Sequence, residues 1–275
     1  MNIKKVSEVI CDNMSVYESK TKLTLRQLIL LAMFAGIFIA IGAASSSAAV
    51  FGITNAGLAK CLAGVIFPVG LILVVLIGGE LFTGDCLMIF GILDKRLKIM
   101  PVIKTLILVF VFNLIGSLVV VFLVNQSGQL DLGDGALGAA TIKTAYTKLN
   151  LSFGKAFCSA IMCNILVCLA VLIAGVCQDG AGKIMGIFFT IWAFVLGGYE
   201  HCVANMYYIP AGLLAKGSEK YANAAINAGM SADQINSMSV PGFFLNNLLP
   251  VTLGNMVGGM LLIAVPLYII HKKKK

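Results

Sequence analysis

His201 is an imidazole side chain within a chain that otherwise consists of apolar segments. It lies in the run Gly198-Tyr199-Glu200-His201-Cys202-Val203-Ala204-Asn205-Met206. Imidazole has an unperturbed pKa in the physiological range, so it can pair with an anion as a cation or donate a proton to it. A second run, Gly78-Gly79-Glu80-Leu81-Phe82-Thr83-Gly84-Asp85, supplies a hydroxyl that donates or accepts a hydrogen bond. Ionisable residues at membrane depth mark substrate or ion paths, so we predict that Thr83 and His201 face one passage.

The chemistry predicted for this passage is the binding of a small monovalent anion. A desolvated anion is costly unless it is paired, and a cationic or proton-donating His201 lowers that cost. Glu200 has two possible roles: it orients the histidine ring through the second nitrogen, or it points away into a helix interface. The alternative for His201 itself is a core histidine that the backbone satisfies.

Further polar residues are candidates for the same path. Lys148, at the end of the loop 125–150, would attract anions to the outer mouth, unless it is a solvated or snorkelling lysine. Asn164 and Asn255 lie within apolar segments, where a buried amide lines the pore, hydrogen-bonds a helix break, or does both. Apolar side chains near the breaks could form constrictions that exclude hydrated ions, although singly such residues are more often packing: Phe67, Leu71, Leu81 and Phe194.

The composition is that of a membrane protein. Of the 275 residues, 59% are hydrophobic and 12% are charged, whereas a soluble domain has about 25% charged residues. The net charge of +8 does not indicate nucleic-acid binding, because the lysines cluster between apolar runs as topology signals. The eight cysteines show no CxxC pairing and are expected to be buried apolar residues rather than metal ligands. No Walker motif, catalytic carboxylate pair or exposed Ser-His-Asp arrangement is present, so neither an enzyme nor a cofactor is predicted.

Three parts of the chain are expected. Residues 1–24 lack a signal-peptide apolar region; residues 3–20 have one apolar face, suited to a cytoplasmic amphipathic helix on the membrane surface, with a frayed soluble tail as the alternative. Residues 25–271 form a six-helix transmembrane channel domain, and residues 272–275 a basic cytoplasmic tail. The predicted apolar segments are 25–50, 57–93, 101–124, 151–176, 183–214 and 241–270, of which the second and fifth are interrupted.

The segments also predict orientation and internal symmetry. Most of the 20 lysines and arginines fall on the side of the termini, which the positive-inside rule places in the cytoplasm. The third and sixth segments both carry Asn-x-x-Gly, at Asn113-Leu114-Ile115-Gly116 and Asn255-Met256-Val257-Gly258. With the two interrupted segments, this predicts an all-α membrane protein of six helices in a 3+3 inverted repeat, with a substrate site at the two breaks.

The two interrupted runs, together with Pro250-Val251-Thr252-Leu253-Gly254-Asn255, resemble segments of the formate/nitrite transporter family. The resemblance covers about residues 20–272 and implies an aquaporin-like pentamer with one pore per protomer. It places Lys148, Asn164 and Asn255 at positions where the family has a lysine and asparagines. It also implies that Thr83 and His201 lie between two constrictions, formed by Phe67 and Phe194 on the outer side and by Leu71, Leu81 and Val167 on the inner side.

Members of this family carry formate, nitrite, hydrosulfide, lactate or acetate, all conjugate bases of weak acids. Cys202 after the histidine and Gly84-Asp85 after the threonine differ from the most common residues of the family at these positions. They resemble the hydrosulfide-channel branch more than the other branches. We therefore expect a homopentameric passive channel for hydrosulfide, formate or nitrite in the bilayer of a bacterial inner membrane. The alternatives are an aquaporin-like pore for neutral solutes, a proton-coupled anion symporter, and a sealed structural protein, against which the costly helix breaks argue.

Overall fold

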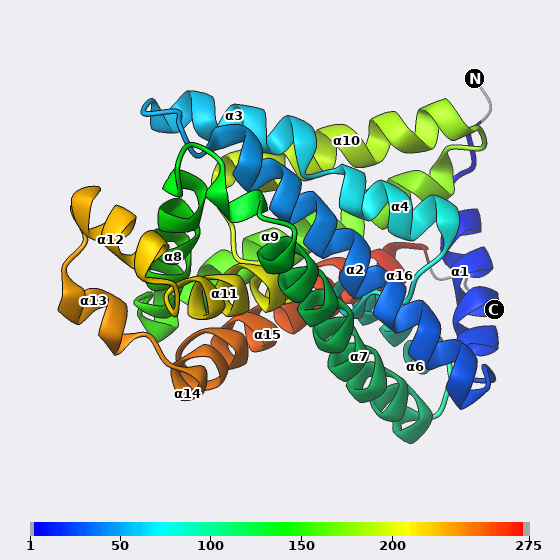
Figure 1. Ribbon diagram of the computed structural model, residues 1–275. Helices are drawn as coiled ribbons and strands as arrows, with labels where there is room; N and C mark the ends of the chain where they lie inside the picture. The colour runs from blue at the N-terminus through cyan, green and yellow to red at the C-terminus, as the bar shows by residue number, and fades with distance from the viewer. Residues whose placement is uncertain (1–2, 272–275) are drawn as a thin grey trace.

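The protein is all-helical, as predicted. A computed structural model describes residues 3–271, and within that range the backbone is helical apart from turns and one isolated bridge between Ile3 and Cys177 (Figure 1). Six helices are long and apolar enough to cross a membrane. They are α2 (Leu25–Val50), α3 with α4 (Ala56–Ile66 and Val69–Ile77), α7 (Ile99–Gln126), α9 (Phe153–Val176), α10 (Gly180–Gly197) and a last span, Val240–His271.

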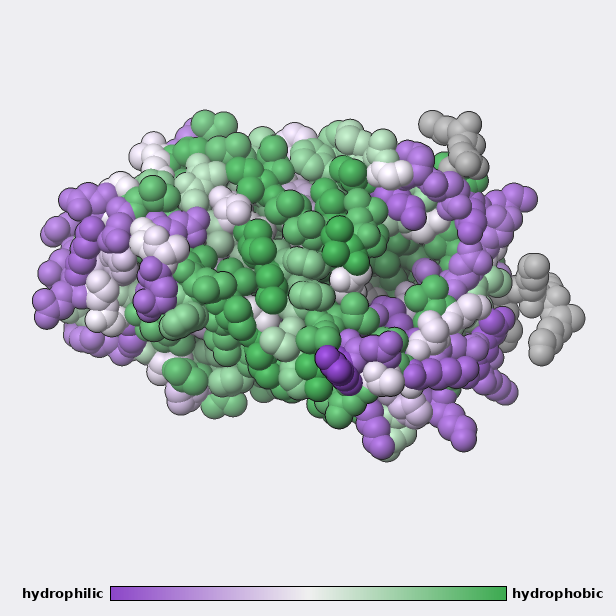
Figure 2. Space-filling view, turned by 45° about the vertical axis from the view of Figure 1, so that its right-hand side comes forward, coloured by the Kyte–Doolittle hydropathy of each residue, from purple (hydrophilic) through white to green (hydrophobic). Residues whose placement is uncertain are grey.

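The surface of the molecule is divided into an apolar band and two polar ends (Figure 2). Large apolar side chains are exposed along the outer spans, for example Ile107, Phe122 and Phe189. Helices α1 (Val6–Lys20) and α16 (Val265–His271) lie at one end, and α8 (Ala136–Leu149), α12 (Glu219–Asn227) and α13 (Ala232–Ser237) lie at the other (Figure 1). This is the arrangement expected of a protein with an even number of spans, because its two ends return to the same side.

Two further apolar helices are too short to span and begin at the predicted breaks. Helix α4 ends at Gly78, and a new helical segment, Phe82–Leu93, starts four residues later and comprises α5 (Phe82–Asp85), η1 (Cys86–Met88) and α6 (Ile89–Leu93). Helix α10 ends at Gly198, and α11 (Cys202–Ala215) starts beyond His201. Both terminal glycines have positive φ, +106° and +66°, a conformation that other residues adopt only with strain.

The two breaks are held by the same hydrogen bonds in the two halves. The Asn113 amide accepts from the Phe82 N–H at 3.0 Å and donates to the Ala32 and Glu80 carbonyls at 2.7 and 2.9 Å. Asn255 repeats this pattern: it accepts from Cys202 at 2.9 Å and donates to Ala160 and Glu200 at 2.8 and 3.1 Å. Backbone groups that the breaks would leave unpaired in lipid are thus satisfied. The inverted repeat is present in the hydrogen bonding and not only in the sequence pattern.

Glycines bring the spans of each half into close contact. A Cβ on Gly116 of α7 would lie 2.1 Å from the Met33 carbonyl oxygen of α2, and one on Gly258 of the last span would lie 2.3 Å from the Ile161 carbonyl oxygen of α9. These are the glycines of the two Asn-x-x-Gly motifs. Small residues at such crossings allow the backbones to approach, which is how membrane helices pack tightly.

The ends of the molecule differ from the prediction in two respects. The apolar face of α1, including Ile10, Met14 and Tyr17, is buried against α6, α9 and α16, so protein covers the face that we expected to lie on the membrane surface. The stretches between spans near the other end contain the short helices α8, α12 and α13; α8 packs mainly on α11, and α12 and α13 pack on α8. Residues 1–2 and the predicted basic tail 272–275 lie outside the described residues.

Candidate substrate path

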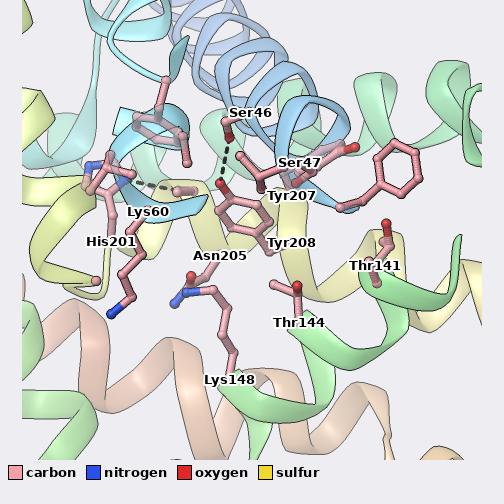
Figure 3. Close-up of a pocket in the computed structure, with 18 of the residues that line it drawn as sticks. Ser46, Ser47, Lys60, Thr141, Thr144, Lys148, His201, Asn205, Tyr207 and Tyr208 are labelled. Carbon is pink, nitrogen blue, oxygen red and sulfur yellow. Dashed lines mark hydrogen bonds between the residues drawn. The ribbon is translucent and has the colours of Figure 1, made fainter. Parts of the chain in front are cut away.

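A cavity of about 350 Å³ opens between α2, α3, α8, α10 and α11 (Figure 3). We call it the Lys148 vestibule. Its wall carries hydroxyl groups from Ser46, Thr141, Thr144 and Tyr208, and its charged lining residues are Lys60 and Lys148. The cavity reaches His201 at its inner end. It therefore joins the predicted central site to one end of the molecule.

Lys148 enters this cavity as part of an ion pair. Its ammonium lies 2.7 Å from Glu200 Oε1 and 5.3 Å from the centre of the Tyr208 ring. Glu200 Oε2 accepts from the Asn205 amide at 2.6 Å, and that amide also donates to Asn247 Oδ1 at 2.7 Å. The hydrogen bonds of the Glu200 carboxylate thus go to Lys148 and to the asparagines and not to the histidine ring. Of the two alternatives for Glu200, the structure has the one in which the carboxylate points away from His201.

Two aromatic rings line the cavity next to the His201 ring. Phe67 and Phe194 meet edge to face with ring centres 5.6 Å apart, and Phe194 lies 6.0 Å from the His201 ring. Both phenylalanines line the Lys148 vestibule and both are buried. The outer constriction that the resemblance implies at these two residues stays a prediction.

At the centre, the two helix breaks meet through one hydrogen bond. Thr83 Oγ1 and His201 Nε2 are 2.8 Å apart, and the two side chains are 0% and 3% exposed. His201 also caps α11, because its Nδ1 accepts the Ala204 N–H at 3.0 Å. A nitrogen that accepts carries no proton, so the proton of a neutral ring is on Nε2 and points to Thr83. The Thr83 hydroxyl hydrogen is then left free to bind an anion.

The other side of the central site opens into a second cavity of about 350 Å³, which we call the Lys20 vestibule. Its lining includes Leu71, Leu81 and Val171. Val167, predicted at this constriction, lies one turn earlier on α9, is buried, and is not among the lining residues. Leu71, Leu81 and the two phenylalanines are each at most 4% exposed, so the passage between the vestibules is closed to solvent in this conformation.

The Lys20 vestibule has an ion pair like that of the Lys148 vestibule, but its lysine contacts two carboxylates in place of one. The Lys20 ammonium lies 2.6 Å from Glu80 Oε2 and 2.6 Å from Asp85 Oδ1, and 5.6 Å from the centre of the Tyr17 ring. Lys20 precedes the first span as Lys148 precedes the fourth. Asp85 follows the first break at the place that Asn205 has after the second. One cluster therefore has a lysine, a carboxylate and an amide, and the other a lysine and two carboxylates.

The two predicted asparagines are buried behind the path. Asn164 donates to the Asn255 carbonyl at 2.7 Å and also lies 3.7 Å from the Cys168 thiol. Asn255 uses its amide on the second break, as described above. Neither residue lines a vestibule; Asn255 hydrogen-bonds a helix break, whereas Asn164 hydrogen-bonds the backbone of the last span.

Four charged residues of the path were missed from the sequence. Glu80 and Asp85 were used only to identify a helix break and, for Asp85, a branch of the family. Lys20 and Lys60 were counted only as topology signals. Lys60, on α3, lines the Lys148 vestibule beside Gly198 and forms no ion pair within residues 3–271. A signal was available for Lys20, since it has the same spacing before the first span as Lys148 has before the fourth.

Known proteins share both the sequence and the fold. A family profile described as Formate/nitrite transporter matches residues 7–269. A probable formate transporter of Methanothermobacter thermautotrophicus is 40% identical, over 91% of this chain and 90% of its own length. Formate channel FocA of Escherichia coli strain K12 is 32% identical, over 89% of this chain and 86% of its own. A solved pentameric formate channel with formate bound has a TM-score of 0.79 at 34% identity, covering 90% of this chain and 98% of that one.

Proposed function

Because the chain belongs to the formate/nitrite transporter family, whose members are channels and transporters and not enzymes, we propose that it is a passive channel for small monovalent anions of weak acids. Formate is the first candidate, since several relatives are named for it. Hydrosulfide and nitrite are the other candidates. Cys202 and the Gly84-Asp85 pair are the residues that favour hydrosulfide. Each is small, monovalent and able to share a proton.

The observation that carries this proposal is the Thr83–His201 hydrogen bond, which lies where two helix breaks meet between two cavities. A sealed helical bundle gains nothing from buried polar groups at such a place. An anion that enters from the Lys148 vestibule passes Phe67 and Phe194 and reaches two groups that donate hydrogen bonds. These groups replace part of its lost hydration.

Each central group has a distinct role in the proposed passage. Thr83 donates its hydroxyl to the anion, while Nε2 of His201 carries the proton that the anion can share. The first turn of α11 begins at His201, so its helix dipole also favours negative charge there. Shared or transferred, the proton lowers the barrier that an unpaired anion would meet in the apolar passage.

The setting of the channel is part of the proposal. The apolar band supports a place in a lipid bilayer, with the ends that carry α1 and α16 in the cytoplasm and the Lys148 vestibule outside (Figure 2). A homopentamer is supported by the similar solved channel, which is described as pentameric. We place it in a bacterial inner membrane.

The proposal is tested by flux into proteoliposomes under an imposed voltage, with formate, hydrosulfide, nitrite and chloride at pH 5.5 and 7.5. We expect voltage-driven current for weak-acid anions in preference to chloride. The informative variant is His201→Asn, whose side-chain oxygen can still cap α11 but whose amide is shorter than the imidazole and has no titratable proton. Its flux should fall by about tenfold or more, the scale on which a lost charge-assisted hydrogen bond acts.

The matched control is His271→Asn at the end of α16, which should leave flux unchanged. Wild-type flux that is equal for chloride and formate would contradict an anion path of this chemistry. Proton-coupled symport is a second candidate, favoured by the Nε2 proton that faces the path. It predicts uptake that rises at pH 5.5 with little current.

A further inference from the structure

The Lys20 vestibule holds more negative than positive charge. Its charged lining residues are Lys20, Glu80 and Asp85, which sum to a net charge of −1 when all are ionised. An anion that crosses the channel must pass this cluster within one cavity. The repulsion of a nearby unit charge at partly buried sites lowers anion occupancy by at least an order of magnitude. The inference below rests on the proposed function, because it concerns how the anion passes this end.

Two carboxylate oxygens in the cluster have no hydrogen-bond partner among the described residues, Asp85 Oδ2 and Glu80 Oε2, although the second lies 2.6 Å from the Lys20 ammonium. Asp85 is 1% exposed, and its Oδ1 accepts from Lys20 at 2.6 Å, but its Oδ2 has no hydrogen-bond partner among the described residues. The Asn13 amide nitrogen on α1, which lines the same cavity, is also without an acceptor. A buried carboxylate oxygen without a donor is costly, and a proton is the smallest ligand that removes the cost.

The other titratable groups that face the cluster keep their protonation state near neutral pH. Burial raises the pKa of Tyr17 on α1, so its hydroxyl stays neutral. Burial lowers the pKa of Lys20, but Asp85 and Glu80 raise it by more, so the net shift is upward and the ammonium stays charged. The thiols of Cys86 on η1 and Cys168 on α9 are the remaining titratable neighbours, and thiols are largely neutral at pH 7.

In the second half of the molecule, the corresponding glutamate has a hydrogen-bond donor for each carboxylate oxygen. At the place of Asp85 this half has Asn205, whose amide donates to Glu200 Oε2 at 2.6 Å, so the lysine and one carboxylate sum to zero. A protonated carboxyl at Asp85 would provide the donor that Asn205 provides in the Lys148 vestibule, and would bring the Lys20 cluster to the same zero charge.

We propose that Glu80 and Asp85 together bind one proton in the Lys20 vestibule, and that anions pass this end of the channel when that proton is bound. The proton comes from the water of the vestibule and is shared between the two carboxylates, so that one of them donates a hydrogen bond to the other. No covalent step or further reactant is needed. The channel is thus sensitive to the pH of the solution at the Lys20 end, separately from any effect of His201.

The test is formate current through the full-length channel in a planar bilayer, with the pH at the Lys148 end fixed at 7 and the pH at the Lys20 end changed from 8 to 6. Orientation is established by protease access to a C-terminal tag. Wild-type current should rise by about tenfold as the pH falls. Asp85→Asn should conduct at pH 8 as wild type does at pH 6, with no remaining dependence on this pH.

The reciprocal variant is Asn205→Asp, which gives the Lys148 ion pair a second carboxylate, as Lys20 has, and should make current depend on the pH at that end. Glu80→Gln, which removes the other carboxylate, should also abolish the dependence, and pentamer retention in detergent checks that each variant folds.

An Asp85→Asn channel with the wild-type response would overturn the inference, and so would a current set by sodium at the Lys20 end and not by pH. Wild-type protein that carries no weak-acid anion would instead overturn the proposed function.

Discussion

The Lys148 and Lys20 vestibules are built from equivalent parts, and their difference lies in charge. Each has a lysine that precedes a span, a glutamate at the start of a helix break, and an aromatic ring over the lysine. Each is capped by a short helix, α8 at one end and α1 at the other. In the Lys148 vestibule amides complete the shell of the glutamate, whereas in the Lys20 vestibule a second carboxylate stands in their place.

The two halves of the repeat share the residues that hold the helix breaks and differ in the charged side chains of the vestibules. The backbone of both breaks needs the same partners, because lipid provides none, so Asn113 and Asn255 are alike. Side chains that meet water in the vestibules are under no such constraint. They can differ in charge and so give the two ends of the channel different responses to solution conditions.

The largest expected effect comes from removing the amide that holds a break. Asn255→Ala leaves the Cys202 N–H and two carbonyls without partners, which costs on the order of 3 kcal/mol or more. Asn113→Ala should cost a similar amount if the halves are equivalent. The measurement is thermal unfolding of the detergent-solubilised protein. The control is Asn150→Ala, which loses one exposed hydrogen bond; a loss confined to one half would break the comparison.

A smaller loss of stability is expected at the helix crossings. Gly116→Ala and Gly258→Ala each place a Cβ against a backbone carbonyl of the neighbouring span, and overpacking of this kind costs about 1–3 kcal/mol. Gly52→Ala, where nothing lies within 4 Å, is the matched control. Melting temperatures of the three variants would show whether both crossings are equally tight, and an unchanged Gly258→Ala protein would contradict the close approach in the second half.

The next effect sharpens the assignment of charge in the Lys148 vestibule. Lys148→Ala leaves Glu200 unpaired beside the path and should lower formate flux by about tenfold. Lys60→Ala removes a cation that has no ion pair in the described residues, and should lower flux by about twofold at low ionic strength. Flux at 0.02 M and 0.5 M salt distinguishes them, since the Lys60 effect should vanish at high salt. A Lys60 effect that persists would mean a direct contact and not steering.

The smallest effect concerns the helices that cover the Lys148 end. A hydrogen bond from Lys220, and a second from Tyr221, lower the pKa of Asp131 below its ordinary value. The bonded carboxylate stabilises the fold above the unfolded pKa of about 3.9, and this contribution is lost as pH falls through the lower folded value. Asp131→Asn should reduce the melting temperature by about one degree at pH 7 and by less at pH 3. Asp134→Asn, almost fully exposed, is the control.

Much of the path was predictable because a membrane restricts what a sequence can do. Glycine pairs and ionisable residues are costly in a span, so the runs around Thr83 and His201 identified the two breaks correctly. The repeated Asn-x-x-Gly motif was visible in the sequence as well, whereas the roles of Phe67 and Phe194 came from the family resemblance and stay predictions. The helices at the ends were not predictable in this way, since α8 has no apolar run of spanning length and is packed against α11 and α12.

The sequence by itself determined the class of protein, the number of spans, the place of the breaks and the family, because hydrophobic length and the cost of buried charge are properties of the chain alone. Only the tertiary structure decided which partner each polar group has. Glu200 pairs with Lys148 and not with His201, and Lys20 reaches two carboxylates from far along the chain. Such pairs form between segments that only folding brings together, so the charge of each vestibule is a property of the packed helices.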